Sequence, residues 1–318
     1  MKAIRWLLPL SLVLMFLSLS IGASSQFSWL KLFQGEEVAY QVFFESRLPR
    51  TLAIVLAAGA MSLSGLLMQT ITQNNYAAPS TVGTVEAAQL GMLISLFFFP
   101  KASLAQKMSF AFISSMLMTL FFIKVVRRLP FKEKWMLPLV GLIYGGMIGA
   151  VAEMIAYRFD LVQSMTSWTQ GSFAMIQTNQ YEWLFLNLII VVGIWRFSES
   201  FSIMNLGEEA STMLGLPFSQ MEAIALFLVS LTTAVTMITV GSLPFLGVII
   251  PNIVRHFVGN HLKKSRRLVF WSGVCLVLAC DILARLIIRP YELSVSVILG
   301  VLGSAIFIWM LWRGDVYD

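Results

Sequence analysis

Ten apolar segments alternate with short polar segments along the chain, and most are long enough to cross a bilayer. A helix needs about 20 apolar residues to span the hydrocarbon core. The segments lie at about residues 1–21, 48–70, 83–99, 104–124, 136–156, 183–197, 219–239, 240–259, 268–288 and 294–312. This pattern predicts an all-α, polytopic membrane protein with about ten transmembrane helices, folded as a single transmembrane domain over residues 1–318.

Two stretches depart from the simple alternation. Residues 22–46 are polar enough to predict a loop. The segment 240–259 is apolar but is interrupted by two glycines and two prolines, Gly241, Pro244, Gly247 and Pro251. Because proline and glycine interrupt helices, we expect a broken helix there.

The first apolar segment has two interpretations. It begins with Lys2 and Arg5 and is followed by the small residues GASS, which also fits a cleaved secretory signal. We favour an uncleaved first helix, because many apolar segments follow and the charge distribution then agrees with the topology.

Composition and charge support a membrane protein and give its orientation. The chain is 58% hydrophobic and 12% charged, whereas soluble domains carry about 25% charged residues. The net charge of +6 comes largely from two basic clusters. They are Lys124, Arg127, Arg128, Lys132 and Lys134, and then Lys263, Lys264, Arg266 and Arg267. Lys and Arg accumulate in cytoplasmic loops, so we expect both termini in the cytoplasm and no nucleic-acid partner.

Signals of a soluble enzyme are missing from the sequence. No Gly-Lys dipeptide occurs, so no phosphate-binding P-loop is present. His256 and His261 have no carboxylate or cysteine at ligand spacing, so we expect no metal site. Cys275 and Cys280 are five residues apart in one apolar segment and are interpreted as buried, unpaired thiols. We therefore expect no catalytic residues and no cofactor bound by this chain, with any ATP and Mg²⁺ on a partner.

The segment Ser46–Gln69 combines small residues with two misplaced cations. Ala58 and Ser62 are four apart, one of several such pairs that let helices approach closely in lipid. Arg47 and Arg50 fall at the N-terminal end of this helix, where the helix dipole disfavours positive charge. Their position suggests a partner other than this helix.

Other charged residues lie inside apolar segments and have either a structural or a functional interpretation. Asp281 and Arg285 are four apart and can pair on one helix face. A glycine series ends on a carboxylate at a spacing of four, which we expect to place all four residues on one face: Gly141, Gly145, Gly149 and Glu153. Glu153 is either a buried, hydrogen-bonded acid or part of a pathway. An ion-coupled secondary carrier that uses Glu153 or the Asp281–Arg285 pair is therefore an alternative.

The cytoplasmic segment 206–217 also has two interpretations. One is a solvated amphipathic linker. The other is a short docking helix with Glu208 and Glu209 in its first turn and Gly215 at its end.

Five blocks of sequence resemble a known family. They cover residues 47–69, 74–84, 205–217, 242–259 and 281–313. In this order they are similar to the permease subunits of iron-siderophore, haem and cobalamin ABC importers, which have the type II importer fold. The resemblance implies a bacterial cytoplasmic membrane protein that works by alternating access. It also implies a second permease subunit, the same or a related chain, two ATP-binding subunits and an extracytoplasmic siderophore-binding protein.

The resemblance also implies roles for individual residues. Arg47, Arg50 and Arg285 match arginines that form salt bridges with glutamates of the binding protein. The segment that docks on the ATPase corresponds to Gly207, Glu208, Glu209, Ala210, Ser211, Leu214 and Gly215. The fifth and tenth helices of the family line the pathway, which suggests that role for the glycine series and Glu153.

One turn departs from the usual family pattern. The turn after the second helix reads NNYAAP over residues 74–79, where the family more often has NPLADP. The variant resembles catecholate-type ferric-siderophore permeases, such as petrobactin or anguibactin importers. A ferric siderophore is therefore the expected substrate.

Overall fold

The computed structural model describes residues 2–22, 27–128, 136–174, 176, 181–259, 262–288 and 291–312. Within these ranges the regular elements are helices and no strand occurs, as predicted for an all-α chain. Lys132, Lys134 and His261 lie outside the described residues, as does the GASS stretch after its glycine.

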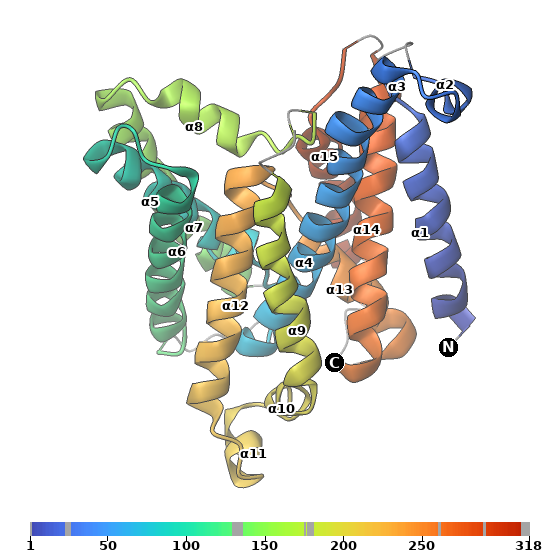
Figure 1. Cartoon of the computed structure of the whole chain (residues 1–318). Helices are drawn as coiled ribbons and strands as arrows, with labels where there is room; N and C mark the ends of the chain where they lie inside the picture. Colours follow the sequence, from blue (N-terminus) through green and yellow to red (C-terminus); the bar gives the residue numbers. More distant parts are fainter. Residues whose placement is uncertain are drawn as a thin grey trace.

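The long helices form one bundle (Figure 1). They are α1 (Lys2–Ser20), α4 (Leu48–Thr72), α5 (Thr84–Phe98), α6 (Leu104–Val126), α7 (Met136–Arg158), α12 (Phe218–Thr239), α13 (Leu246–Val258), α14 (Leu262–Ile287) and α15 (Val295–Trp312). Shorter elements connect them: α2 (Trp29–Phe33), α3 (Glu37–Gln41), η1 (Val42–Arg47), η2 (Pro79–Thr81), α8 (Val162–Thr169), η3 (Tyr181–Asn187), α9 (Leu188–Arg196), α10 (Ser198–Met204) and α11 (Glu208–Met213).

All ten predicted apolar segments contain helix in the described residues. Among the described residues, five helices are long and apolar enough to cross a membrane, and one further pair of helical segments is bent by 71° at Phe197. Four shorter apolar helices complete the set. The chain is thus a polytopic, all-helical membrane protein, and the number of ten crossings stays a prediction.

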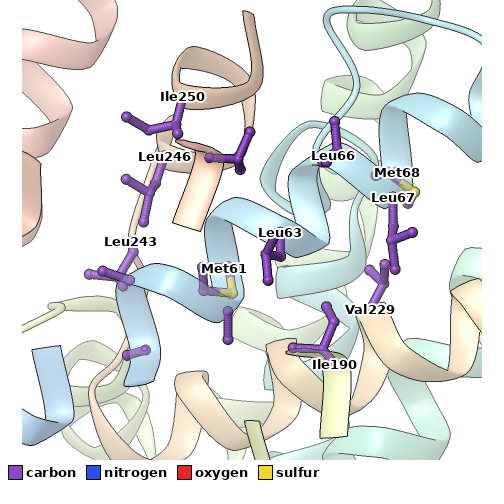
Figure 2. Packing of buried hydrophobic residues seen from close by; sticks show 14 of the residues in the cluster. Met61, Leu63, Leu66, Leu67, Met68, Ile190, Val229, Leu243, Leu246 and Ile250 are labelled. Atoms are coloured by element: carbon purple, nitrogen blue, oxygen red, sulfur yellow. The ribbon is translucent and has the colours of Figure 1, made fainter. Parts of the chain in front are cut away.

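Helix α4 is the centre of the bundle, because its small residues allow its neighbours to approach closely. In its apolar 18-residue stretch, 89% of the residues are buried. A Cβ atom added at Gly65 would lie 2.1 Å from the Gly247 carbonyl oxygen of α13. One added at Gly273 of α14 would lie 1.9 Å from Ser62 Oγ. Figure 2 shows the apolar side chains of α4 packed between α13 on one side and α9 and α12 on the other. The predicted packing function of the small residues is confirmed.

Helices α6 and α7 lie at the edge of the bundle. In the apolar 18-residue stretch of each helix, only 33% of the residues of α6 and 28% of the residues of α7 are buried. Large apolar side chains such as Leu117 and Met147 are therefore exposed on the single chain. Surfaces of this composition face lipid or another subunit.

The two irregular stretches have different outcomes. The broken helix is confirmed, because α13 begins only at Leu246 and Phe245 adopts a left-handed backbone with φ of 61°. The 22–46 loop prediction is wrong in part, because α2, α3 and η1 occupy residues 29–47. The contacts that order this stretch are aromatic: Phe16 stacks on Trp29 with ring centroids 5.3 Å apart.

Helix α14 begins six residues earlier than predicted. Its first turns contain Lys263, Lys264, Arg266 and Arg267, which the sequence suggested were a loop. Lys and Arg are good helix formers, so their charge does not interrupt the helix. The Arg266 guanidinium lies 4.6 Å from the centre of the Trp195 ring and ties this end of α14 to α9.

Candidate functional site

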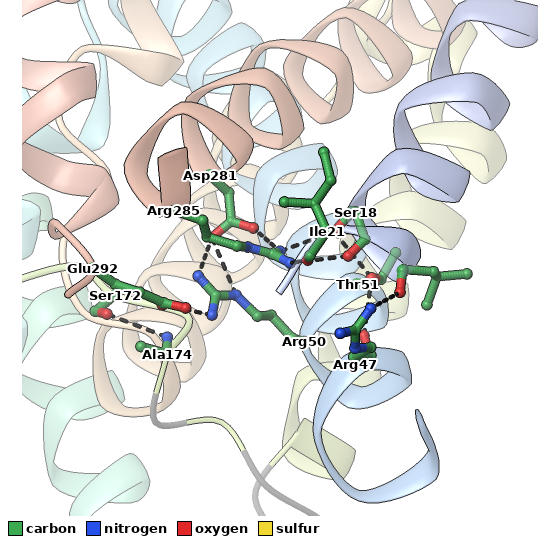
Figure 3. A network of polar contacts seen from close by, with 11 residues as sticks. Ser18, Ile21, Arg47, Arg50, Thr51, Ser172, Ala174, Asp281, Arg285 and Glu292 are labelled. Atoms are coloured by element: carbon green, nitrogen blue, oxygen red, sulfur yellow. Dashed lines mark hydrogen bonds and ion pairs between the residues drawn. The ribbon is translucent and has the colours of Figure 1, made fainter. Parts of the chain in front are cut away.

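A network of buried ions joins α1, α4, α14 and the segment after α14 (Figure 3). Arg50 Nη2 lies 2.7 Å from Asp281 Oδ1, and Arg50 Nη1 lies 2.7 Å from Glu292 Oε2. Arg285 also pairs with Asp281, on its other carboxylate oxygen. Asp281 is fully buried, and its two guanidinium partners supply the compensation that a buried carboxylate requires.

Two of the arginines cap the C-terminal end of α1. Arg47 Nη1 donates to the carbonyl oxygens of Leu19 and Ser20, both at 2.7 Å. Arg285 Nη1 donates to the carbonyl oxygens of Ser18 and Ile21 at 2.9 and 2.6 Å. The last four carbonyls of a helix have no partner within the helix and carry its negative dipole end. Arg47, which the dipole of α4 disfavours at its own start, therefore stabilises the end of α1 together with Arg285 of α14.

In the free chain the three arginines that were predicted to bind a partner lie below the surface. Arg47, Arg50 and Arg285 are all buried, at 5%, 8% and 4% exposure. The sequence argument considered only the dipole of the arginines' own helix and omitted the carbonyl end of α1. Binding-protein docking through these residues stays a prediction, and in the free chain their hydrogen bonds are internal.

Sequence reasoning also missed Glu292 and Ser18. Glu292 lies in the short segment before α15 and was not distinguished from a loop acid. Ser18 accepts a hydrogen bond from Arg285 Nη2 at 2.9 Å through its Oγ, in a helix that the sequence suggested was simply apolar. The available signal was Ser18 itself, because a polar residue near the end of an apolar segment can accept a hydrogen bond from an arginine in another helix.

The predicted glycine face of α7 divides into two parts. A Cβ atom at Gly141 would lie 2.0 Å from the Thr81 carbonyl oxygen, and one at Gly145 would lie 3.2 Å from the Gly83 Cα atom. Gly149 has open space, and Glu153 is exposed on the single chain. At about 3.6 residues per turn, each step of four residues advances the helix about 40° past a full turn, so three steps rotate it about 120°. The expectation of one common face was therefore wrong, and pathway lining by this series stays a prediction.

An apolar cavity of about 300 Å³ lies between α7 and α15. Its wall is formed by Tyr76, Ser80, Thr81, Pro138, Leu139, Leu142, Pro244, Phe245 and Phe307. These two helices are the ones that the family resemblance assigns to the pathway, but the residues that α7 contributes are not its glycines. The one ionisable residue of this wall is Tyr76, whose phenol is neutral at pH 7, and burial raises its pKa further.

The segment 206–217 forms a short helix, and its end is built as predicted. Gly215 has a φ of 80°, and its N–H donates to the Thr212 carbonyl at 2.9 Å. The Leu216 N–H donates to the Ser211 carbonyl at 3.0 Å, which completes a Schellman motif. In Figure 1, α11 projects from the bundle at the end opposite α2 and α8.

Only part of this segment is available to a partner. Met213 and Leu214 are 87% and 63% exposed. Ser211 is fully buried and donates from its Oγ to the Ile203 carbonyl at 2.8 Å, which holds α11 against α10. Ser211 therefore supports the turn in the free chain, and its predicted contact with a partner stays a prediction. Docking by the exposed residues stays a prediction.

The fold and these features define a helical membrane permease, and comparison with known proteins gives its family. The model of the FecCD transport family matches residues 10–313. The chain belongs to this family.

Three relatives align over nearly all of the chain. The petrobactin import system permease protein YclN of Bacillus subtilis (strain 168) is 40% identical over 314 residues, which cover 99% of both chains. The petrobactin import system permease protein FatD of Bacillus anthracis is 37% identical and covers 92% of this chain and 88% of its own. The ferric-anguibactin transport system permease protein FatD of Vibrio anguillarum is 33% identical and covers 93% and 94%.

A solved structure shares the fold. It is an inward-facing metal-chelate type ABC transporter, with a TM-score of 0.79 and 24% identity over 98% of this chain and 99% of that chain. The predicted type II importer permease fold is confirmed.

Proposed function

We propose that this chain is the membrane permease of an ABC importer and that its substrate is a ferric siderophore of the catecholate type. The observation that carries the proposal is the end-to-end alignment with a petrobactin import permease at 40% identity. The NNYAAP turn at residues 74–79 points to the same group of permeases. The permease supplies an alternating-access route and changes no covalent bond.

The partners are part of the proposal. A second permease subunit completes the pathway, two ATP-binding subunits bind ATP and Mg²⁺, and a binding protein delivers the siderophore from outside. The exposed apolar tip of α11, Met213 and Leu214, suits insertion into an ATPase surface. In this proposal both termini lie in the cytoplasm, and the complex lies in the cytoplasmic membrane of a bacterial cell.

The described contacts do not favour the ion-coupled carrier. Asp281 accepts hydrogen bonds from two guanidinium groups, an arrangement typical of a structural ion pair. Glu153 lies on an exposed part of α7 with no cation paired to it among the described residues. Neither group resembles an acid that is held ready to bind and release a proton.

Uptake in cells tests the substrate class. A strain that lacks this chain should fail to accumulate radioactive iron from ferric petrobactin, and the wild-type chain should restore accumulation. Cobalamin uptake should be the same in both strains. Iron uptake that is unaffected by the deletion, or cobalamin uptake that depends on this chain, would contradict the proposal.

A further inference from the structure

One arginine at the α11 end of the bundle ends one helix and contacts two others. Arg127, which ends α6, donates from Nη2 to Glu222 Oε1 in α12 at 2.7 Å. Its Nη1 lies 3.6 Å from Glu208 Oε2 at the start of α11. The guanidinium also lies 5.5 Å from the centre of the Phe218 ring at the start of α12.

The contact with Glu222 is the strong one. Glu222 is 9% exposed, and a carboxylate at that depth is costly without a cation. Charge-assisted hydrogen bonds of this length are stronger than neutral ones. By contrast, Lys263 and Glu199 are paired at 3.1 Å but are 64% and 81% exposed, so solvent weakens their attraction.

Helix α11 has few other attachments. Glycines with left-handed backbones flank it, Gly207 with φ of 98° and Gly215 with φ of 80°. Ser211 fastens it to the neighbouring α10. Among the ion pairs between described residues, only Arg127–Glu208 joins α11 to a long helix.

The long helices that Arg127 joins, α6 and α12, pack against each other and are connected to the cavity through α5 and α7. Helix α6 lies against α12 and α5, and α5 lies against α7, whose residues form part of the cavity wall. A displacement of α11 that is passed to Arg127 therefore acts on helices of the bundle itself.

We propose that Arg127 is a positioning residue that couples movement of α11 to α6 and α12, so that work done by the ATPase reaches the transport pathway. The inference rests on the proposed function, because it takes α11 as the surface that the ATPase moves. It assigns a function to a side chain outside the docking segment.

The test uses the complete complex in proteoliposomes and measures two rates: ATP hydrolysis, and ferric siderophore transported per ATP. Arg127→Gln should lower transport per ATP by about tenfold, the loss expected for one charge-assisted hydrogen bond. ATP hydrolysis and complex assembly should stay within about twofold of the wild type, because the variant leaves the docking surface of α11 intact. Glu222→Gln should reproduce the effect.

Two further variants separate coupling from folding. Lys263→Gln removes a cation from the exposed pair at the same end of the molecule and should leave both rates within about twofold of wild type. The conservative variant Arg127→Lys keeps a cation between Glu222 and Glu208 and should retain part of the transport per ATP. Wild-type coupling in Arg127→Gln would overturn the proposal, as would a parallel loss of assembly, hydrolysis and transport that Arg127→Lys does not reduce. If the wild-type complex itself shows no ATP-dependent transport, the proposed function fails instead.

Discussion

Arg50 Nη2 lies 2.7 Å from Asp281 Oδ1, although 231 residues separate them in the sequence. The contact joins the start of α4 to the last turns of α14. Arg285 shares the same carboxylate and Arg50 also pairs with Glu292, so two acids balance two cations, and Asp281 is the acid that contacts both. The stability of this end of the bundle therefore depends on Asp281 more than on any one arginine.

Replacing Asp281 by Asn should destabilise the protein strongly. The change keeps the shape but leaves Arg50 and Arg285 with less compensation, and breaking a buried pair costs about 3–5 kcal/mol. Denaturation of the purified protein in detergent measures the free energy of unfolding. Glu153→Gln, at an exposed position, is the matched control and should have little effect. Equal stability of the two variants would refute the structural function of the network.

Arg47→Ala should weaken the connection between α1 and the bundle. It removes two hydrogen bonds to the last carbonyls of α1, and hydrogen bonds to charged groups contribute about 1.5–3 kcal/mol. The same denaturation measurement applies. Lys31→Ala is the control, because the Lys31–Glu36 pair is about half exposed and such pairs contribute at most about 1 kcal/mol. A loss for Arg47→Ala that is no larger than the loss for Lys31→Ala would show that Arg47 does not stabilise the end of α1.

Two glycines of α7 should respond in opposite directions to the same substitution. Gly141→Ala places a Cβ atom 2.0 Å from a backbone oxygen and should cost about 1–3 kcal/mol through overpacking. Gly149→Ala meets no atom within 4 Å and should stabilise the helix by about 0.5–1 kcal/mol. Thermal unfolding of both variants makes the comparison. Similar effects would mean that the two residues share one environment after all.

Cysteine crosslinking distinguishes exposed residues of α11 from its buried support. Met213→Cys should crosslink to the ATPase subunit, because this side chain is 87% exposed at the tip of the helix. Ser211→Cys should not, because this position is fully buried within the chain. Cys275 and Cys280 are buried thiols, so background reaction should be low. Crosslinking at residue 211 but not at residue 213 would contradict the described orientation of α11.

The helices themselves were predictable from local sequence. Apolar length and flanking polar residues placed α4, α6 and α12 within about two residues of their observed ends, which is the usual ambiguity of helix boundaries. The end of α11 at Gly215 was also predictable, because a glycine in a Schellman motif is a local signal.

The site was less predictable, because it depends on contacts between distant segments. The poor fit of Arg47 to its own helix was visible in the sequence, but its acceptors on α1 were not. Arg127 was recognised only as part of a basic cluster, since Glu222 lies 95 residues further along the chain. The glycine spacing in α7 was read correctly, but the rotation of the helix separates Gly141 from Glu153.

ATP-driven transport by the reconstituted complex shows whether this chain is the permease of an ABC importer. Proteoliposomes that contain this permease, its partner permease and the ATPase should accumulate ferric siderophore from the loaded binding protein when ATP is supplied. An inactive ATPase variant should abolish accumulation, and collapsing the proton gradient should not. Accumulation that proceeds without ATP and follows the proton gradient would contradict the account and indicate an ion-coupled carrier.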